Sequence, residues 1–333
     1  METVQGFILL DVDVAALNNA GSDKSSNLDN AVVTKKIWKN GKAYPYVSGQ
    51  AWRYWWRDTL AKSFDWEMSP VIREKKIAYT QADPFRYPDD DLFGYMRAEK
   101  KDTLTRVSPL KNSALIALSP NPIVQNWAAM TRQDGDAVPF GIDEYCATLK
   151  GMFSIDLDQV GTFSMANRTG FMNINESMKK TALEEGCVEM DDPLSPGDSK
   201  TAGKLVRMPA AVREKRFKEA VLALKMLSGG AKQTTNMVDF TPKLIVLTRF
   251  KGGNHPFSHL GKEELGKPVF SIEALVEILE DFKDQFMGDI FIGKRKGFMD
   301  DLDGPLREIA DKRVKTGPVN AAIEGFVNTL ALS

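Results

Sequence analysis

The sequence has few of the residues on which metal centres and disulfide frameworks depend. It contains 2 cysteines and 2 histidines among 333 residues. Cys146 and Cys187 have neither a CxxC nor a CxxCH spacing, so they form neither a disulfide framework nor a zinc knuckle. Pro256 lies between His255 and His259, and no glutamate completes an HExxH motif. The sequence therefore predicts no metal site and no cofactor.

Hydrolase and calcium motifs are also missing. No serine lies in a GxSxG motif. Neither of the two histidines is a good candidate for the base of a serine triad or of a Cys–His pair. Asp300, Asp301 and Asp303 lack the glycine and glutamate offsets of an EF-hand loop. We therefore expect a protein without catalytic residues.

No apolar run approaches the roughly 18–20 residues that span a bilayer, and Glu2 is acidic where a signal peptide carries lysine or arginine. The sequence therefore predicts a cytoplasmic protein with no membrane partner. Hydrophobic residues make up 43% of the chain and charged residues 27%, as in ordinary globular proteins, so a sizeable core can be buried.

Neither sign of charge dominates, because the net charge is −1, and this argues against a histone-like nucleic-acid binder. The charges are nevertheless unevenly distributed. Residues 140–199 carry 4 basic and 11 acidic residues, whereas residues 200–255 carry 12 basic and 3 acidic residues. Local basic density sets the field that a phosphate backbone meets, so the second segment indicates either a nucleic-acid surface or one solvated helix face.

The pattern of apolar residues predicts strands alternating with helices. Strands are predicted over residues 4–14, 144–164 (a long strand or hairpin) and 237–250, and helices over residues 48–60, 209–230, 271–286 and 318–332. Residues 15–36 are predicted to be a long loop, and residues 167–204 a mobile hairpin or loop. Residues 64–140, broken by seven prolines, are predicted to be an inserted subdomain. Without the insertions the order is βαββαβ, the α+β order of ferredoxin-like and RNA-recognition folds.

The predicted helix over residues 48–60 carries two stripes. Trp52, Trp56 and Leu60 recur every four residues and are predicted to face the core. Arg53 and Arg57 form the second stripe, which suits either a solvated face or a ligand contact.

A glycine-rich loop, GGAKQTTN, occupies residues 229–236. It lacks the Walker A spacing, and it runs from helix to strand rather than from strand to helix. Glycines allow close approach of the backbone to a ligand, and Lys232, Gln233 and Thr234 can donate to phosphate or sugar oxygens. A glycine pair that simply ends the helix is the alternative explanation.

Five segments together resemble a known family. They are GFILLDVDVAALNN, TKKIWKNGKAYPYVSGQAWRYWWRDTL, DLFGYM, GMFSIDLDQVGTFS and GGAKQTT. The combination is similar to the DevR-type backbone subunit of type I CRISPR interference complexes (Cascade), in the branch of type I-B. The resemblance covers about residues 4–250.

The resemblance implies an α+β, hand-shaped protein with an RRM-like (ferredoxin-like) palm, a helical finger insertion and a thumb hairpin or loop. The implied palm comprises residues 1–63, 141–164 and 207–250, the fingers residues 64–140, the thumb residues 165–206, and a C-terminal helical elaboration residues 251–333. The palm lacks the aromatic signature of RNA-recognition domains, so base stacking on the sheet is not expected.

The implied function is a scaffold that polymerises along crRNA and presents it to a target DNA strand. Its partners would be crRNA, target DNA, further copies of itself and other Cascade subunits. Each thumb would kink the neighbour's guide, with Met165 as an apolar wedge. The implied RNA contacts are Asn19, Lys35, Lys36, Ser48, Gln50, Arg53, Arg57, Met165, Asn167, Arg168, Gly230, Ala231, Lys232, Gln233 and Thr234.

A ribonuclease subunit is the alternative function. Related backbone subunits of type III complexes cut target RNA with an aspartate in the loop after the first strand, where this chain has Asp23 and Asp29. The DLFG and GQAW segments resemble the type I proteins, and they favour the non-catalytic scaffold.

Overall fold

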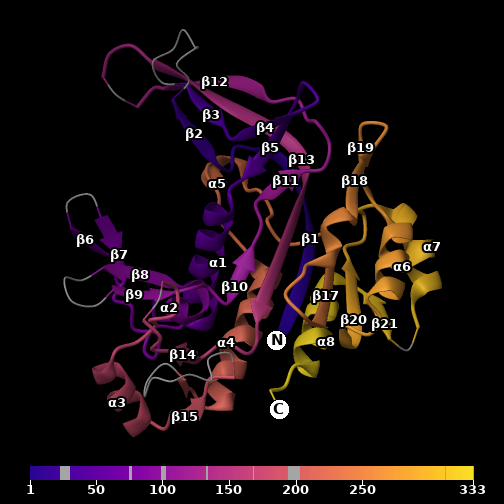
Figure 1. Ribbon diagram of the computed structural model, residues 1–333. Coiled ribbons are helices and arrows are strands. Elements are labelled where there is room, and N and C mark those ends of the chain that lie inside the picture. Colours follow the sequence, from indigo (N-terminus) through magenta and orange to yellow (C-terminus); the bar gives the residue numbers. More distant parts are fainter. Residues whose placement is uncertain are drawn as a thin grey trace.

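The computed structural model describes residues 1–22, 31–74, 77–98, 103–132, 134–167, 169–193, 203–311 and 313–332. Within these ranges a 12-stranded, mostly antiparallel sheet forms the centre of an α+β fold (Figure 1). Its main path consists, in spatial order, of β21 (Val314–Gly317), β20 (Phe286–Lys294), β17 (Leu244–Lys251), β1 (Glu2–Ala15), β13 (Val138–Asp156), β11 (Leu115–Ala117), β5 (Lys42–Val47) and β4 (Lys36–Lys39). Beside this path lie β2 (Asn19–Ser22), β3 (Val32–Thr34), β10 (Leu110–Asn112) and β12 (Val124–Met130). Strands β2 and β3 fall in the segment predicted to be a loop.

Strand β1 is the centre of the sheet. It pairs antiparallel with β13 on one side and with β17 on the other, and residues 3–10 are buried without interruption. The sequence prediction of a strand buried on both faces is confirmed.

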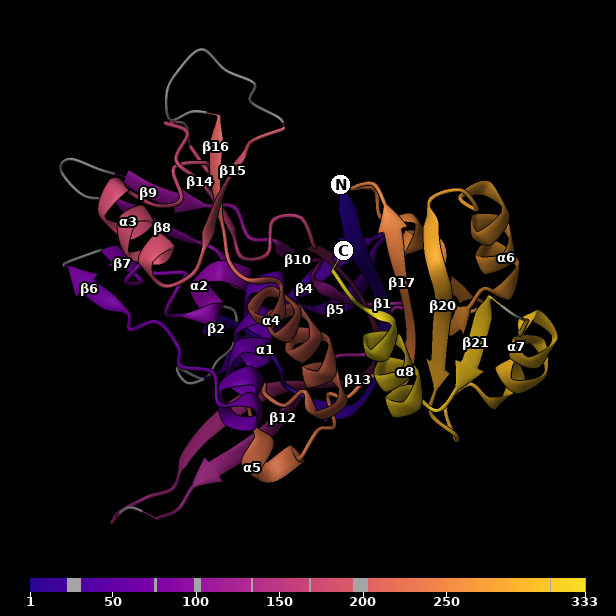
Figure 2. The same cartoon turned by 90° about the horizontal axis from the view of Figure 1, so that it is seen from below.

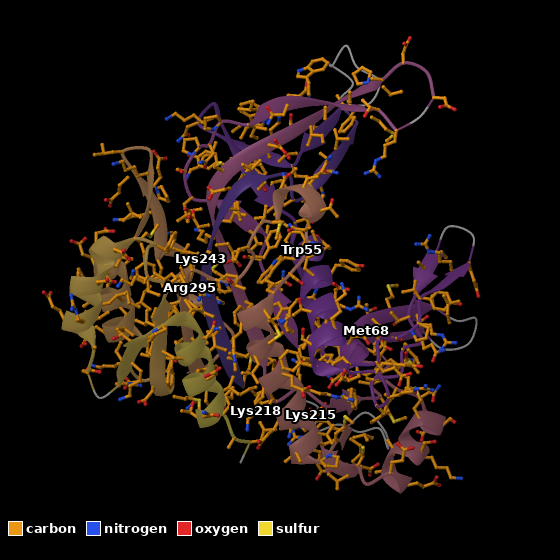
Figure 3. The ribbon with its side chains drawn as sticks, turned by 180° about the vertical axis from the view of Figure 1, so that it is seen from behind. Trp55, Met68, Lys215, Lys218, Lys243 and Arg295 are labelled. Atoms are coloured by element: carbon orange, nitrogen blue, oxygen red, sulfur yellow. The ribbon has the colours of Figure 1, made fainter. Side chains whose placement is uncertain are left out.

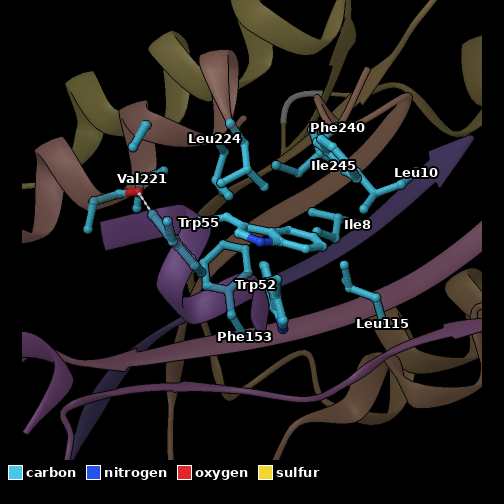
Figure 4. Close-up of a cluster of buried hydrophobic side chains, with 14 of the residues drawn as sticks. Ile8, Leu10, Trp52, Trp55, Leu115, Phe153, Val221, Leu224, Phe240 and Ile245 are labelled. Atoms are coloured by element: carbon cyan, nitrogen blue, oxygen red, sulfur yellow. Dashed lines mark hydrogen bonds between the residues drawn. The ribbon is translucent and has the colours of Figure 1, made fainter. Parts of the chain in front are cut away.

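One face of the sheet is covered by α1 (Gly49–Phe64), α4 (Ala210–Leu222) and α8 (Val319–Thr329). Ile8 and Leu10 of β1 lie there in one core cluster with Trp52 (Figure 4). Trp56 belongs to the same cluster, and both tryptophans are fully buried. The Nε1 of Trp56 donates to the carbonyl of Ala220 on α4 (2.8 Å). The predicted inward tryptophan stripe is therefore confirmed. Two short helices, η1 (Ala223–Met226) and α5 (Gln233–Asn236), follow α4.

The opposite face is covered by the C-terminal third of the chain. Phe7 and Leu9 of β1 pack there against Phe257, Phe270 and Leu275. These three come from η2 (Pro256–His259), from the hairpin of β18 (Gly261–Glu264) and β19 (Lys267–Phe270), and from α6 (Ile272–Asp281); η3 (Asp300–Leu302) and α7 (Asp303–Ile309) complete the layer. The prediction of a helical elaboration is thus wrong in part, because β20 and β21 extend the main sheet.

The first insertion is built mainly of strands. Its described part contains the hairpins of β6 (Ile72–Glu74) with β7 (Ile77–Tyr79) and of β8 (Tyr95–Ala98) with β9 (Thr103–Arg106). Between them, α2 (Pro88–Phe93) is only six residues long. The prediction of helical fingers is wrong, because the prolines of this segment interrupt helical hydrogen bonding.

The second insertion has a small core of its own. Strands β14 (Thr162–Ser164), β16 (Lys204–Arg207) and β15 (Val188–Asp191) form a three-stranded sheet beside α3 (Glu176–Glu184). Phe163, Ile174 and Val206 are buried between them. Of the predicted hairpin or loop, the hairpin agrees with the antiparallel pairing of β15 with β16. Helix α3 was not predicted, although Asn175 caps it with a side chain that accepts the N–H of Met178 (3.0 Å).

Figures 1 and 2 place the second insertion and the β12–β13 hairpin at opposite ends of the molecule. The main sheet and α1 lie between them. Among the described helices, none is long and apolar enough to cross a membrane.

Candidate nucleic-acid interface

Asn18 connects the segment after β1 to the beginning of α1. Its side-chain oxygen accepts the N–H of Ser48 (2.9 Å), and its carbonyl accepts the N–H of Lys35 (3.0 Å). Asn19 and Lys36, the next predicted contacts, are exposed. The structure therefore brings Asn19, Lys35 and Lys36 to the same place as Ser48.

Helix α1 begins with a polar cap, and its first turn has no acidic side chain. The hydroxyl of Ser48 accepts the N–H of Ala51 (3.3 Å), and Gln50 is exposed. The first N–H groups of a 16-residue helix carry partial positive charge, which suits a phosphate group.

The glycine loop packs directly on α1. A Cβ on Gly229 would lie 2.2 Å from Cγ of Trp55, and the φ angles of Gly229 and Gly230 are +155° and +87°. The N–H of Ala231 donates to the carbonyl of Leu17 (3.4 Å). Only glycine fits these positions, and they hold the loop beside the segment that follows β1.

Lys232, Gln233 and Thr234 follow the glycines. The ammonium of Lys232 lies 5.0 Å from the centre of the Phe140 ring, Gln233 is half-buried and Thr234 is exposed. The structure therefore brings together three predicted groups of contacts: the segment after β1, the beginning of α1 and the glycine loop. Polar groups from all three segments therefore lie close together just beyond the end of β1.

The β12–β13 hairpin, which includes Phe140, is a part of this region that sequence reasoning missed. Trp127 and Met130 on β12 are 63% and 59% exposed. The side chain of Asn236, next to the glycine loop, donates to the carboxylate of Glu144 on β13 (3.0 Å). The apolar alternation of β12 is too weak to predict a strand. The one signal in its sequence was an aromatic residue, Trp127, and its exposure is known only from the structure.

The basic block of residues 200–255 does not form one surface. Lys215 and Lys218 pair with glutamates four residues away on α4, and Arg213 and Arg216 are buried. Figure 3 shows Lys215 and Lys218 on α4 at a distance from Trp55 of α1. Lys243 lies apart from these two lysines and from Trp55. Further intramolecular ion pairs use Lys204, Lys225, Lys243 and Arg249. The density of basic residues in the sequence therefore overstates the field at the surface.

Arg53 and Arg57 face the first insertion. Arg57 pairs with the buried carboxylate of Asp89. Burial, and secondarily the charge of Arg57, lowers the pKa of Arg53 to about 10, so it stays protonated at neutral pH. The Arg53 guanidinium donates to the carbonyls of Phe93 (3.0 Å) and Leu110 (2.7 Å), the Ser108 hydroxyl (2.8 Å) and Oδ1 of Asn112 (2.8 Å). This geometry favours a packing role for Arg53 over the phosphate contact that the resemblance implies, and nothing in the structure tests that contact for either arginine.

The predicted thumb contacts lie away from the other contacts. Met165 is half-buried against the small core of the second insertion and forms an isolated bridge with Met172, while Asn167 is exposed. The role of Met165 as a wedge stays a prediction. Arg168 lies outside the described residues, and so do the alternative nuclease residues Asp23 and Asp29.

Among the described residues, no group of three or more histidine, cysteine, aspartate or glutamate side chains could hold a metal ion. The Nε2 of His255 lies 3.1 Å from the carbonyl of Gly6 and 3.0 Å from that of Phe153. His255 is therefore a half-buried residue whose ring is hydrogen-bonded to the backbone.

Comparisons with known proteins agree with one another. A family model described as "CRISPR-associated negative auto-regulator DevR/Csa2" matches residues 10–259. Two solved structures described as "CRISPR RNA-guided surveillance complex" and "CRISPR RNA-guided surveillance complex, pre-nicking" have TM-scores of 0.54 and 0.56. Each is 11% identical to this chain, and the matches cover 98% of it and 98% and 99% of theirs. This likeness shows a shared fold. No curated protein sequence matches the chain.

Proposed function

Because the chain belongs to the CRISPR-associated DevR/Csa2 family, we propose that it is a non-catalytic, guide-RNA-binding backbone subunit of a type I-B Cascade complex. One observation carries the proposal. The segment after β1, the beginning of α1 and the glycine loop meet at one place, joined by Asn18 to Ser48 (2.9 Å) and by Ala231 to Leu17 (3.4 Å). Backbone N–H groups, amides and lysines in one place suit a phosphate backbone more than a catalytic reaction.

The order of the central strands supports an RRM-like palm. Along the chain, the elements concerned are β1, α1, β11, β13, α4 and β17, and of these β11 lies within residues 64–140, which the sequence assigned to the fingers. In the sheet these strands lie in the order β17, β1, β13, β11, and every neighbouring pair is antiparallel. This is the arrangement expected of a βαββαβ unit with both helices on one face.

The separation of the second insertion from the interface supports a repeating assembly. In both ribbon views α5 lies on the side of the molecule that carries the β12–β13 hairpin, and the second insertion lies at the opposite end (Figures 1 and 2). One copy can then hold its own stretch of guide while its second insertion reaches the adjacent copy. The guide segments between such contacts would pair with target DNA.

The test is RNA binding by the full chain. A guide-length RNA and a scrambled RNA of equal length are titrated at several salt concentrations, and the complexes are sized by analytical ultracentrifugation. We expect similar affinities for both RNAs, a log–log salt slope of about −0.7 per phosphate contact, and discrete multimers on the RNA. Absence of binding, or strong preference for one sequence, would overturn the proposal.

The same preparation tests the nuclease alternative. The RNA complex is incubated with complementary RNA and magnesium, and the products are separated on a denaturing gel. We expect no cleavage. Cleavage that disappears in Asp23→Asn or Asp29→Asn would replace the scaffold proposal with the ribonuclease.

A further inference from the structure

Two exposed apolar residues beside the glycine loop have backbone conformations that side-chain-bearing residues rarely adopt. The φ angles of Val14 and Met237 are +46° and +47°. Their side chains are 49% and 83% exposed. A positive φ is uncommon for any residue other than glycine, and for a β-branched valine it is an outlier.

A hydrogen bond links Val14 to Asn236, the residue that precedes Met237. The side-chain amide of Asn236 donates to the carbonyl of Val14 (2.6 Å) and to the carboxylate of Glu144 (3.0 Å). The N–H of Met237, the residue after Asn236, donates to the carbonyl of Gln233 (3.2 Å). Both strained conformations are thus fixed by their surroundings, as is usual where strain is kept at a ligand clamp.

The side chains at these positions give the isolated chain little packing. Glycine adopts a positive φ without strain, so Val14 and Met237 are unfavourable choices for the backbone. Because Met237 is 83% and Val14 49% exposed, the core compensates for that strain only in part. A ligand that meets both apolar side chains would supply the compensating contact, and Val14 lies at the β-bulge between Val12 and Ala15 that brings it beside the glycine loop.

The surroundings indicate the chemistry of this ligand. Lys232, also at a positive φ of +63°, lies in the same loop with its ammonium over the Phe140 ring. Thr234 and Thr235 are exposed beside it. A cation and hydroxyls next to an apolar pair match a nucleotide, whose phosphate is charged and whose base has an apolar face.

We propose that Val14 and Met237 contact the face of one unstacked base of single-stranded RNA, while Lys232 holds a neighbouring phosphate. The proposal deepens the proposed function and rests on it, because the RNA must pass the glycine loop. Contact with the face of a base reads no hydrogen-bonding edge, so it tolerates any sequence. An unbranched methionine adapts to bases of different size.

The test uses Val14→Gly and Met237→Gly, which remove the side chains and relieve the strain. The probe is a guide-length RNA carrying a single 2-aminopurine, moved one position at a time. At one register we expect the parent protein to change the fluorescence, and each variant to lose that change. The affinity of Met237→Gly should fall by about two- to tenfold, the size of one sulfur–aromatic contact, and that of Val14→Gly should also fall, with the salt slope unchanged in both variants. The thermal midpoint should not fall.

Two controls define the result. Leu265 has the same backbone class (φ +50°) and is fully exposed at the tip of the β18–β19 hairpin, so Leu265→Gly should leave RNA affinity unchanged. Lys232→Gln should instead reduce the salt slope by about 0.7.

A parent protein that binds RNA, with Val14→Gly and Met237→Gly variants of parental affinity and fluorescence, would overturn this proposal alone. A lower thermal midpoint with unchanged affinity would assign both residues a structural role and overturn it equally. A parent protein that does not bind RNA would overturn the proposed function and this proposal with it.

Discussion

The carboxylate of Asp91 lies against the guanidinium of Arg106, and the two side chains are 0% and 2% exposed. Arg216 donates to the same carboxylate (2.7 Å), and so does the N–H of Gly161 (3.0 Å). One buried aspartate therefore ties α2 and β9 of the first insertion to α4 and to the turn that follows β13. That turn leads into the second insertion, so the relative placement of three parts of the molecule depends on this pair.

Asp91→Asn should strongly destabilise the protein. The substitution leaves Arg106 and Arg216 buried without their counter-charge, and breaking a buried pair in this way costs about 3–5 kcal/mol. The free energy of unfolding, measured in urea, should fall by that amount.

Asp300→Asn is the matched control for this prediction. Asp300 also pairs with a lysine, Lys294, but its side chain is 51% exposed, so the pair is screened by water. We expect only a small change in unfolding. Equal losses in the two variants would show that the burial of Asp91 is not the cause.

Arg53→Ala should change stability rather than RNA binding. The variant loses four hydrogen bonds from one guanidinium to the first insertion, and bonds to charged groups contribute about 1.5–3 kcal/mol each. We expect the free energy of unfolding to fall by at least the contribution of one such bond, about 1.5–3 kcal/mol. The salt slope of RNA binding should keep its parental value. A stable variant whose slope is smaller by about 0.7 would instead make Arg53 a phosphate ligand.

The central elements of the fold could be predicted from the sequence because their determinants are local. Gln5 is the only polar side chain in residues 4–10, so neither face of a strand there would be polar. Such a run is typical of a strand covered on both faces. Trp52, Trp56 and Leu60 recur at helical spacing and lie in the core, as predicted. Ser48 caps α1 in the position that its sequence indicates.

The rest depends on contacts that sequence spacing does not contain. The acceptors of Arg53 lie 40 to 59 residues further along the chain, so its stripe beside the tryptophans resembles a free cationic face until the insertion is placed. Hairpins of three- and four-residue strands are similarly hard to predict, because their pairing and not their periodicity defines them. The basic segment of residues 200–255 predicts a cationic surface only if its glutamate and aspartate partners, which lie elsewhere in the fold or one turn away, are left out.

Gly229→Ala should disrupt both packing and the candidate interface. The new methyl group would lie 2.2 Å from Trp55, and the backbone would be held at a φ of +155°. Overpacking of this kind costs about 1–3 kcal/mol, so the thermal midpoint and the RNA affinity should both fall. Gly317→Ala is the control, because a Cβ there meets no atom within 4 Å and Gly317 lies in a strand. Equal effects of the two substitutions would contradict a specific fit against Trp55.

His255 should make stability depend on pH. Burial is the main cause that lowers the pKa of His255 below its ordinary value of 6.5. As the pH falls through about 6.5, His255 therefore becomes protonated in the unfolded chain while it stays neutral in the folded protein. Stability is then complete above this range and decreases as the pH falls toward the depressed pKa of the folded state, by at most about 1.4 kcal/mol per pH unit.

The measurement for His255 is the urea midpoint at pH 7.5, 6.5 and 5.5 for the parent and for His255→Gln. Glutamine can donate from its own Nε2 toward the carbonyls of Gly6 and Phe153 but does not titrate, so the variant should show a flatter profile over this range. His259→Gln, at the exposed end of η2, should keep the parental profile. Parallel profiles for the parent and His255→Gln would show that another titratable group controls the pH dependence.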